Sequence, residues 1–215
     1  MISASVHQMQ TLGDQYLILS LLRPNGFHYQ AGQYVTFEMS GASGDAFQRS
    51  YSIASAPLNF KTLEFCIQTG LDGKGAEFFK KLRVGSLISM SPALGAFSIR
   101  DSKAKLVFIA GGSGISPMRS LILEGLKSNS SFNALLVYGC KDAKWIPFRE
   151  EFQSLPIECL ITADSDGLNP VEALKKRGVD PQAHYYLCGP PGLMLAMRAL
   201  LAEQGVPAEH VFAQG

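Results

Sequence analysis

The chain has 215 residues, of which 47% are hydrophobic and 17% are charged, a composition typical of a folded globular protein. Its 19 basic and 18 acidic side chains leave a net charge of +1, which gives no indication of a nucleic acid or an anionic membrane as partner. No apolar run is long enough to span a bilayer, and residues 1–10 lack the pattern of a secretory signal, so we expect a cytoplasmic protein with no membrane span.

The first half of the chain, residues 1–100, consists of short alternating runs rich in β-branched and aromatic residues, separated by Gly, Pro and Asn. We expect strands over 16–22, 33–39, 62–68 and 86–90, with one short helix over 76–82. Strands at this spacing with turn residues between them predict a small antiparallel barrel, which we expect to have six strands.

After a polar stretch at 101–104 the pattern changes to near-continuous apolar strands, each followed by a segment that can form a helix. These strands are expected over 106–110, 134–138, 157–161, 185–188 and 210–213. Buried strands that alternate with helices predict a five-stranded parallel sheet. The chain is therefore expected to have two domains, a barrel over 1–100 and an α/β domain over 104–215.

Several helix ends in the second half follow known capping rules. Asn169 can cap a helix that has Pro170 at its first position and Glu172 in its first turn, and Gly178 ends that helix. The last helix is expected over 191–204.

The four cysteines, Cys66, Cys140, Cys159 and Cys188, stand singly and far apart. No two of them have the spacing of zinc or iron–sulfur ligands, so the sequence predicts no metal site. In a reducing compartment they are expected to be free thiols.

The first motif that can carry chemistry is Arg49-Ser50-Tyr51-Ser52, near the end of the third or fourth barrel strand. Strand alternation sends Arg49 and Tyr51 to one face, and the two serines to the other. Together they offer a guanidinium for phosphate, an aromatic face and a hydroxyl donor. Taken by itself, the motif fits an amphipathic strand with a surface arginine better.

The second motif is the glycine-rich stretch 111–117 between a buried strand and a helix. Glycines let the backbone approach a ligand, and the N-terminus of the helix offers free N–H groups to a phosphate. The stretch lacks the G-x-G-x-x-G dinucleotide pattern. It also differs from the G-x-S-x-G motif of hydrolases, because Ile115 replaces the last glycine. An α/β serine hydrolase that uses Ser113 is nevertheless the alternative function.

The third motif is Cys188-Gly189-Pro190-Pro191-Gly192, at the end of the fourth α/β strand. Ligands of open sheets bind at the carboxyl ends of strands, which places Cys188 and Gly189 at the rim. A buried structural cysteine is the more frequent explanation of such a residue on its own.

In this order, the three motifs and the Tyr138-Gly139 strand end resemble the ferredoxin–NADP reductase superfamily, and within it the flavin reductase and oxygenase-reductase branch. The resemblance covers nearly the whole chain. It implies that the barrel binds a flavin, with FAD favoured over FMN and the choice between them left open, and that the α/β domain binds NADH or NADPH.

The resemblance also implies roles for residues of the barrel. Arg49 would neutralise the flavin phosphates, Tyr51 would lie against the isoalloxazine ring, and Ser52 would be a catalytic hydrogen-bond donor near N5. Relatives usually have a serine or threonine near Ala76, but here only the helix N-terminus is available. The implied flavin-binding residues are Arg49, Ser50, Tyr51, Ser52, Ile67, Gln68, Thr69, Gly73, Lys74, Gly75 and Ala76.

In the second domain the glycine-rich stretch would bind the pyrophosphate of the nucleotide. Cys188 would be the second catalytic residue, beside nicotinamide C4. The implied nucleotide-binding residues are Gly111, Gly112, Ser113, Gly114, Pro117, Cys188, Gly189 and Pro190. Lys141 and Lys144 could meet a 2′-phosphate, whereas Asp142 would favour a free hydroxyl, so the choice of nucleotide stays open.

The implied activity is that of an oxidoreductase that passes a hydride from NAD(P)H to bound FAD and electrons on to an acceptor. The acceptor could be a ferredoxin, a flavodoxin, an oxygenase component or free flavin. Relatives that serve oxygenases often carry a fused iron–sulfur domain, which we do not expect here. At the C-terminal end, Phe212 or Gln214 could approach the flavin. A non-catalytic nucleotide-binding subunit is disfavoured because Arg49, Tyr51 and Ser52 are all present.

Overall fold

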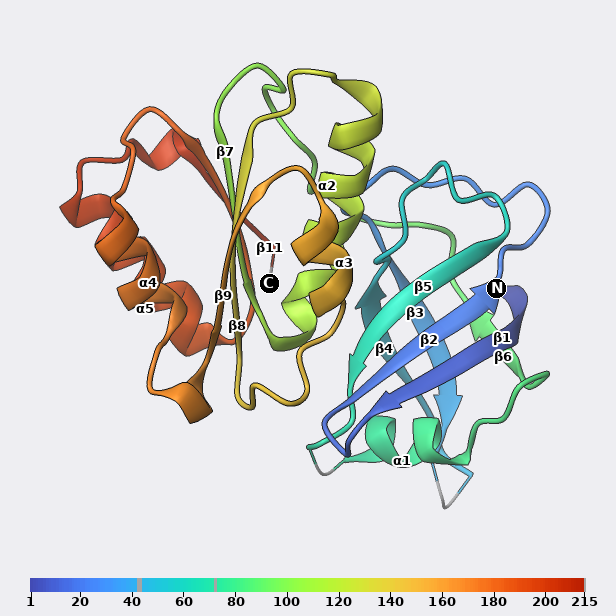
Figure 1. Cartoon of the computed structure of the whole chain (residues 1–215). Helices are drawn as coiled ribbons and strands as arrows, with labels where there is room; N and C mark the ends of the chain where they lie inside the picture. Colours follow the sequence, from blue (N-terminus) through green and yellow to red (C-terminus); the bar gives the residue numbers. More distant parts are fainter. Residues whose placement is uncertain (42–43, 72, 215) are drawn as a thin grey trace.

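The computed structural model describes residues 1–41, 44–71 and 73–214. These residues form two β-sheets that lie side by side (Figure 1). The N-terminal sheet has six antiparallel strands in the order β4-β3-β6-β1-β2-β5. Its elements are β1 (Ile2–Leu12), β2 (Tyr16–Leu22), β3 (Tyr34–Ser40), β4 (Ala46–Ser52), β5 (Thr62–Gln68), α1 (Lys74–Lys81) and β6 (Leu87–Met90).

Backbone hydrogen bonds bring the two edges of this sheet together as a barrel. Just beyond β4, the Ala54 N–H donates to the Glu64 carbonyl of β5 at 2.7 Å, which joins the two edge strands. The Ile53 N–H donates to the Gln33 carbonyl at 2.9 Å and extends the pairing of β4 with β3. Alternate residues of each strand point inward, where Leu19, Val35 and Phe65 are fully buried. Because these bonds close the barrel beside β4, the 49–52 motif lies next to the seam.

The C-terminal sheet has five parallel strands in the order β11-β10-β7-β8-β9. The order reverses between β7 and β10, which makes the carboxyl ends of these two strands the topological switch point. The elements of this half are β7 (Leu106–Gly111), α2 (Ile115–Ser128), β8 (Ala134–Cys140), α3 (Arg149–Ser154), β9 (Glu158–Ala163), α4 (Pro170–Arg177), β10 (His184–Cys188), α5 (Pro191–Glu203) and β11 (Val211–Gln214).

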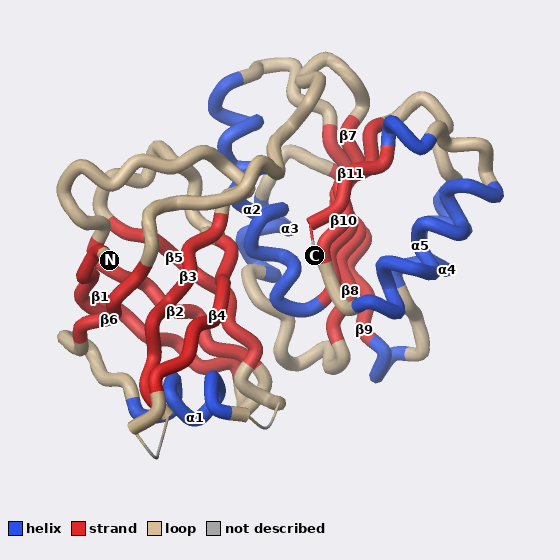
Figure 2. Tube along the Cα trace, turned by 180° about the vertical axis from the view of Figure 1, so that it is seen from behind, coloured by secondary structure: helices blue, strands red, loops and turns tan. Residues whose placement is uncertain are grey.

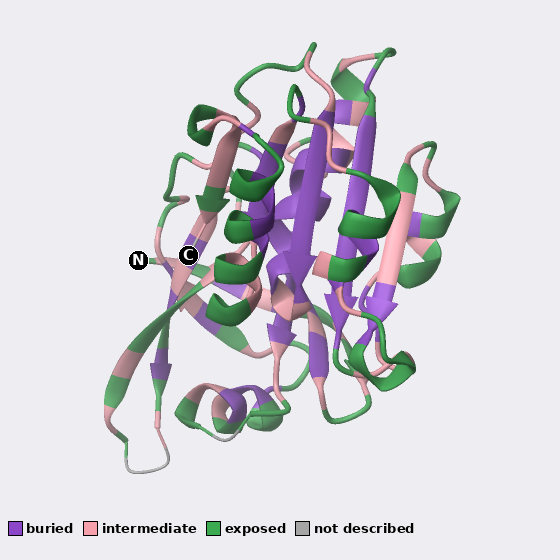
Figure 3. Ribbon diagram, turned by 90° about the vertical axis from the view of Figure 1, so that its left-hand side faces the viewer, coloured by how far each residue is buried: buried purple, intermediate pink, exposed green. Residues whose placement is uncertain are grey.

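Helices cover both faces of the parallel sheet, α4 and α5 on the outer face and α2 and α3 between the sheet and the barrel (Figure 2). The burial pattern follows from this, since every residue of β7 and β8 is buried (Figure 3). Phe108 packs in the core that includes α2, and its neighbour Ile109 packs in the core that includes α4 and α5.

The predicted fold class is confirmed, and the strand ranges differ by only a few residues at their ends. The predicted start of α4 is also confirmed, because the Asn169 side chain accepts a hydrogen bond from the Glu172 N–H at 3.0 Å. All four cysteines are free thiols. None of the described helices is long and apolar enough to cross a membrane. The domain boundary near residues 100–104 stays a prediction.

A buried arginine on α2 joins the two domains. Arg119 donates to the Glu64 carboxylate of β5 at 2.8 Å and, through two nitrogens, to the Glu151 carboxylate of α3 at 2.5 and 2.9 Å. It also donates to the Ala54 carbonyl at 3.0 Å, and its guanidinium lies 4.3 Å from the centre of the Phe148 ring. The side chain is only 10% exposed, so these contacts replace its lost hydration.

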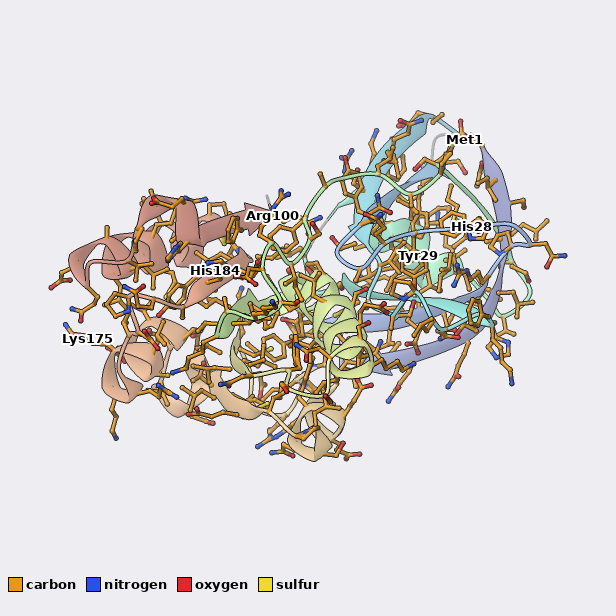
Figure 4. The ribbon with its side chains drawn as sticks, turned by 90° about the horizontal axis from the view of Figure 1, so that it is seen from above. Met1, His28, Tyr29, Arg100, Lys175 and His184 are labelled. Atoms are coloured by element: carbon orange, nitrogen blue, oxygen red, sulfur yellow. The ribbon has the colours of Figure 1, made fainter. Side chains whose placement is uncertain are left out.

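Further polar contacts keep α2 and the sheet against the barrel. The Ser120 hydroxyl donates to the Ser55 carbonyl at 2.7 Å, and the Ser116 hydroxyl accepts from the Cys66 N–H at 3.3 Å. At the junction of the two halves, where Arg100 lies (Figure 4), the Arg100 N–H donates to the Tyr186 hydroxyl at 2.8 Å. The two sheets are therefore fixed to each other by specific hydrogen bonds as well as by apolar packing.

Replacing Arg119 with methionine (Arg119→Met) should lower the free energy of unfolding by about 3 kcal/mol, because it leaves two carboxylates without their cation at the domain interface. Urea unfolding measures this. The control is Arg177→Met, which removes a surface ion pair with Glu158 and should cost less than about 1 kcal/mol. Equal losses in the two variants would contradict a special role for Arg119.

Candidate functional site

The first candidate region lies where the end of β4 meets the N-terminus of α1. Tyr51 packs between two aromatic rings of the barrel, with ring centres 5.2 Å from Phe37 and 5.3 Å from Phe79. Its hydroxyl lies 3.3 Å from the point where a Cβ on Gly75 would stand, so it reaches the first turn of α1. Burial raises the pKa of Tyr51 to about 12, and the phenol is therefore uncharged at neutral pH.

The groups that could bind a phosphate converge in this region. Arg49 is exposed, and its side chain bonds only to the neighbouring Gln48 carbonyl among the described residues. The N-terminus of α1, at Gly73, has no side-chain cap, so its first N–H groups are available. Lys74 forms an ion pair with Asp45 beside them. The guanidinium lies 5.5 Å from the centre of the Phe47 ring and is otherwise exposed. An exposed guanidinium on the strand whose Tyr51 reaches an uncapped helix N-terminus fits a phosphate-bearing cofactor such as FAD.

The other predicted flavin-binding residues lie in different surroundings. The Ser50 hydroxyl bonds to Thr36 at 3.0 Å, and Ser52 is half-buried. Ile67 and Ala76 are buried, so only their main chains could contact a cofactor. The Thr69 hydroxyl donates to the Asp14 carbonyl at 3.1 Å. Gln68 lines the second candidate region, described next. The sequence did not indicate this position, since it assigned Gln68 to the flavin.

The second candidate region is a cavity of about 590 Å³ at the carboxyl edge of the parallel sheet. It opens between the ends of β7, β8 and β9 on one side and the first turns of α4 and α5 on the other. Its lining residues are Tyr16, Gln68, Gly111, Gly112, Gly139, Cys140, Lys141, Asp164, Asn169, Pro170, Val171, Glu172, Pro190, Leu193 and Ala196. Of the predicted nucleotide-binding residues, it therefore brings together Gly111, Gly112 and Pro190.

The glycines of this loop are required by the backbone. Gly112 has φ of 54°, in the left-handed region that favours glycine. A Cβ on Gly114 would overlap the Cys188 carbonyl, and a Cβ on Gly189 would lie 2.9 Å from the Gly111 nitrogen. The loop after β7 thus packs directly on the loop after β10. Ser113 is half-buried in the loop after β7, and Pro117 is buried in the first turn of α2.

A smaller cleft of about 320 Å³ is lined by strand neighbours of the two predicted catalytic residues, although neither Ser52 nor Cys188 lines it. Tyr34 and Gln214 both line it. Tyr34 pairs with Ser52 across β3 and β4, and Gln214 pairs with Cys188 across β11 and β10. Ser52 and Cys188 each lie one strand from the same cleft, although they come from different domains. Phe212 also lines it, but its ring stacks on Tyr186 at 4.9 Å.

The thiol of Cys188 is uncharged at neutral pH, because burial raises its pKa to about 11. It can neither attack as a thiolate nor accept a proton efficiently. Burial raises the pKa of Tyr16 in the wall of the cavity as well. These groups can contact and orient a ligand, but they are unsuited to acid–base chemistry near pH 7.

The arrangement does not support a serine hydrolase. Ser113 follows the carboxyl end of β7, whereas His184 begins β10 and pairs with Leu106 at the other end of the sheet. The end of β7 beside His184 and the end that precedes Ser113 are five residues apart along the strand, which corresponds to about 16 Å. His210 packs on His184, with 4.6 Å between the ring centres. Among the described residues there is also no group of three or more His, Cys, Asp or Glu side chains that could hold a metal ion.

Sequence reasoning missed Arg119, Tyr16 and Asp164. A signal for Arg119 was present, because it lies on the same helical face as Ile115 and Ile122, which are both fully buried. The positions of Tyr16 and Asp164 in the cavity wall depend on how the domains and strands are arranged.

The close contact at Gly114 provides a test of this geometry. Gly114→Ala should lower the free energy of unfolding by about 1–3 kcal/mol, because the new methyl group meets main-chain atoms that cannot turn away. Gly192→Ala is the matched control, since a Cβ there has no atom within 4 Å and alanine suits the first turn of α5. Urea unfolding compares the two, and a loss in Gly192→Ala as large as in Gly114→Ala would contradict the account.

Comparisons with known proteins agree with this geometry. A family model described as the oxidoreductase FAD-binding domain matches residues 5–99, and one described as the oxidoreductase NAD-binding domain matches residues 108–159. The first candidate region therefore falls within the FAD-binding match, and the part of the second region between Gly111 and Lys141 falls within the NAD-binding match.

Among curated proteins, the reductase component of phenol 2-monooxygenase from Pseudomonas sp. (strain CF600) is 30% identical over 220 residues, which cover 91% of this chain and 59% of that protein. Ferredoxin–NADP reductase B from Sorangium cellulosum is 29% identical over 217 residues, covering 90% of this chain and 88% of that protein. The chain thus spans about three fifths of the first relative and most of the second.

Among solved structures, a ferredoxin–NADP reductase from Neisseria gonorrhoeae with bound FAD and NADP superimposes with a TM-score of 0.87 at 20% identity, covering 99% of this chain and 97% of that one. A flavohemoglobin from Malassezia yamatoensis with bound FAD and heme gives 0.85 at 19% identity, covering 99% and 59%. With both family models matched in order along the same fold, the chain carries the FAD-binding and NAD-binding domains of an oxidoreductase in the ferredoxin–NADP reductase-like fold.

Proposed function

We propose that the chain oxidises NADH or NADPH through bound FAD and passes the electrons to a separate acceptor. The observation that carries this proposal is the common cleft, because the predicted catalytic residues of both domains, Ser52 and Cys188, lie one strand from it on opposite sides. Ligands bound at the two candidate regions would meet there. Bound FAD supplies the redox chemistry, since a flavin accepts two electrons as a hydride and can release them singly.

The protein contributes binding and orientation. Arg49 and the N–H groups at the start of α1 bind the flavin phosphates, Tyr51 supports the ring, and Ser52 donates a hydrogen bond to it. The loop over Gly111–Gly114 binds the nucleotide pyrophosphate. Cys188, as a neutral thiol, limits how the nicotinamide can lie. Holding two reactants in contact geometry removes much of the entropy cost of their encounter.

A small redox protein or an oxygenase component is the acceptor we propose, with free flavin as the alternative. The support is the character of the relatives, which include the reductase component of phenol 2-monooxygenase and ferredoxin–NADP reductase B. A cytoplasmic location, where NADH and NADPH are available, is part of the proposal.

The proposed activity is tested by loading the purified chain with FAD, removing the excess and recording the visible spectrum without oxygen. Addition of NADH or NADPH should bleach the flavin band. Turnover that requires added free flavin would make flavin a substrate instead of a resident cofactor. The absence of bleaching and turnover with either nucleotide and either FAD or FMN would refute the proposal.

The phosphate-binding role of Arg49 predicts that Arg49→Gln weakens FAD binding about 10- to 100-fold, as expected for the loss of a charge-assisted hydrogen bond. Quenching of FAD fluorescence measures the affinity. Arg198→Gln, which removes an exposed arginine on α5, should leave it unchanged. Wild-type affinity in Arg49→Gln would show that this side chain does not contact the flavin phosphates.

A further inference from the structure

The cavity in the second domain bears on which nucleotide the chain uses, an inference that rests on the proposed function. NADH and NADPH differ only in a phosphate on the adenosine 2′ oxygen. The choice between them is made by the charges that surround the adenosine ribose.

Strand register indicates where that ribose lies. Gly111, Gly139 and Thr162 stand side by side across β7, β8 and β9. Neighbouring strands are about 4.8 Å apart, so the end of β9 lies about 10 Å from the glycine loop. The nicotinamide half must extend toward Cys188 on β10, which flanks β7 on its other side. A nucleotide with its pyrophosphate at Gly111–Gly112 therefore extends its adenosine half over the ends of β8 and β9.

Acidic groups predominate at that end of the cavity. Its charged lining residues are Lys141 after β8, Asp164 after β9 and Glu172 in the first turn of α4, which makes two carboxylates and one ammonium. Neither carboxylate forms an ion pair or hydrogen bond with another described residue. Both are therefore available to a ligand.

The backbone holds Asp164 at this position. The Ser165 N–H donates to the Lys141 carbonyl at 3.0 Å, and the Ala143 N–H donates to the Ser165 hydroxyl at 3.1 Å, so the loops after β8 and β9 are tied together. Asp164 also affects Cys140, which lines the same cavity. Burial raises the pKa of the Cys140 thiol to about 11, and the negative charge of Asp164 adds to this rise.

The acidic residue considered from the sequence, Asp142, is placed differently. Its carboxylate accepts the Lys144 N–H at 2.8 Å within its own turn. Neither Asp142 nor Lys144 is among the residues that line the cavity. The aspartate that lines the cavity is therefore Asp164, which follows β9, and not Asp142, which follows β8.

We propose that Asp164, with Glu172 as a second carboxylate, makes this chain select NADH over NADPH. Ionised carboxylates accept hydrogen bonds from the free hydroxyls of an adenosine ribose. A 2′-phosphate carries about −1.5 to −2 charges at pH 7 and would meet two negative groups and a single lysine. The same two residues that favour a free ribose therefore repel its phosphorylated form.

The test uses redox-inactive probes, ADP-ribose and 2′-phospho-ADP-ribose, titrated into the FAD-loaded chain by isothermal calorimetry at low salt. The wild-type chain should bind ADP-ribose at least about 30-fold more tightly, a ratio typical of a like-charge penalty. Asp164→Asn should reduce the ratio to about 3-fold, and the double variant Asp164→Asn/Glu172→Gln should abolish it.

Asp166→Asn is the matched control, because Asp166 lies in the same short helix, Asp164–Asp166, but bonds to Ser165 and does not line the cavity. It should keep the wild-type ratio. Equal or tighter binding of the 2′-phosphorylated probe by the wild type, or an unchanged ratio in Asp164→Asn, would overturn the inference and leave the proposed function intact. Binding of neither probe would overturn both.

Discussion

Arg119 carries its charge between the two sheets, where water cannot solvate it, and two glutamates from different elements compensate it. Removing a guanidinium from water is costly, so the site is stable only while β5, α3 and the chain after β4 stay around it. The requirement is mutual, since the glutamates lose their cation if α2 moves away. This one network makes the relative position of the two domains a condition of stability.

The position of α2 then determines the geometry of both candidate regions. Its N-terminus follows the glycine loop directly, so the loop moves with the helix. Its polar side chains bond to Ala54 and Ser55, two and three residues beyond the 49–52 motif. Helix α2 thus links the two regions: the glycine loop precedes its N-terminus, and its side chains bond to the chain just after the 49–52 motif. Tyr34 and Gln214, the strand neighbours of Ser52 and Cys188, line one cleft between the two halves of the chain.

The chemistry that this arrangement favours depends on position more than on reactivity. Burial keeps the Cys188 thiol and the Tyr51 phenol in their neutral forms at physiological pH. Neither can exchange protons efficiently with a ligand there. What remains is the capacity to hold two flat rings in contact, and a hydride transfer between bound cofactors needs little else from the protein.

Much of the fold could be predicted because its signals are local. The cap at Asn169 depends only on neighbouring residues, and near-continuous apolar runs in the sequence predict the buried strands β7 and β8. The glycine loop was found for the same reason. The carboxylate of Asp164 was not, because its place in the cavity depends on the order of β7, β8 and β9, which no local pattern specifies.

The partners of Arg119 were beyond prediction for a related reason, since Glu64 and Glu151 are 55 and 32 residues away along the chain. Gln68 illustrates a further limit. The strand that carries it was predicted correctly, but its side chain lines the cavity of the other domain because β2 and β5 are packed on both faces. Interfaces between domains combine residues whose sequence patterns are unrelated.

If the protein holds the nicotinamide and the flavin in contact, with Cys188 limiting how the nicotinamide can lie, one fixed face of the nicotinamide must meet the flavin. The most direct measurement uses NADH deuterated at C4 in one or the other stereochemical position, oxidised by the FAD-loaded chain, with mass spectrometry of the NAD⁺ formed. We expect complete loss of deuterium from one isomer and complete retention in the other. A mixture of labelled and unlabelled NAD⁺ from both isomers would contradict it.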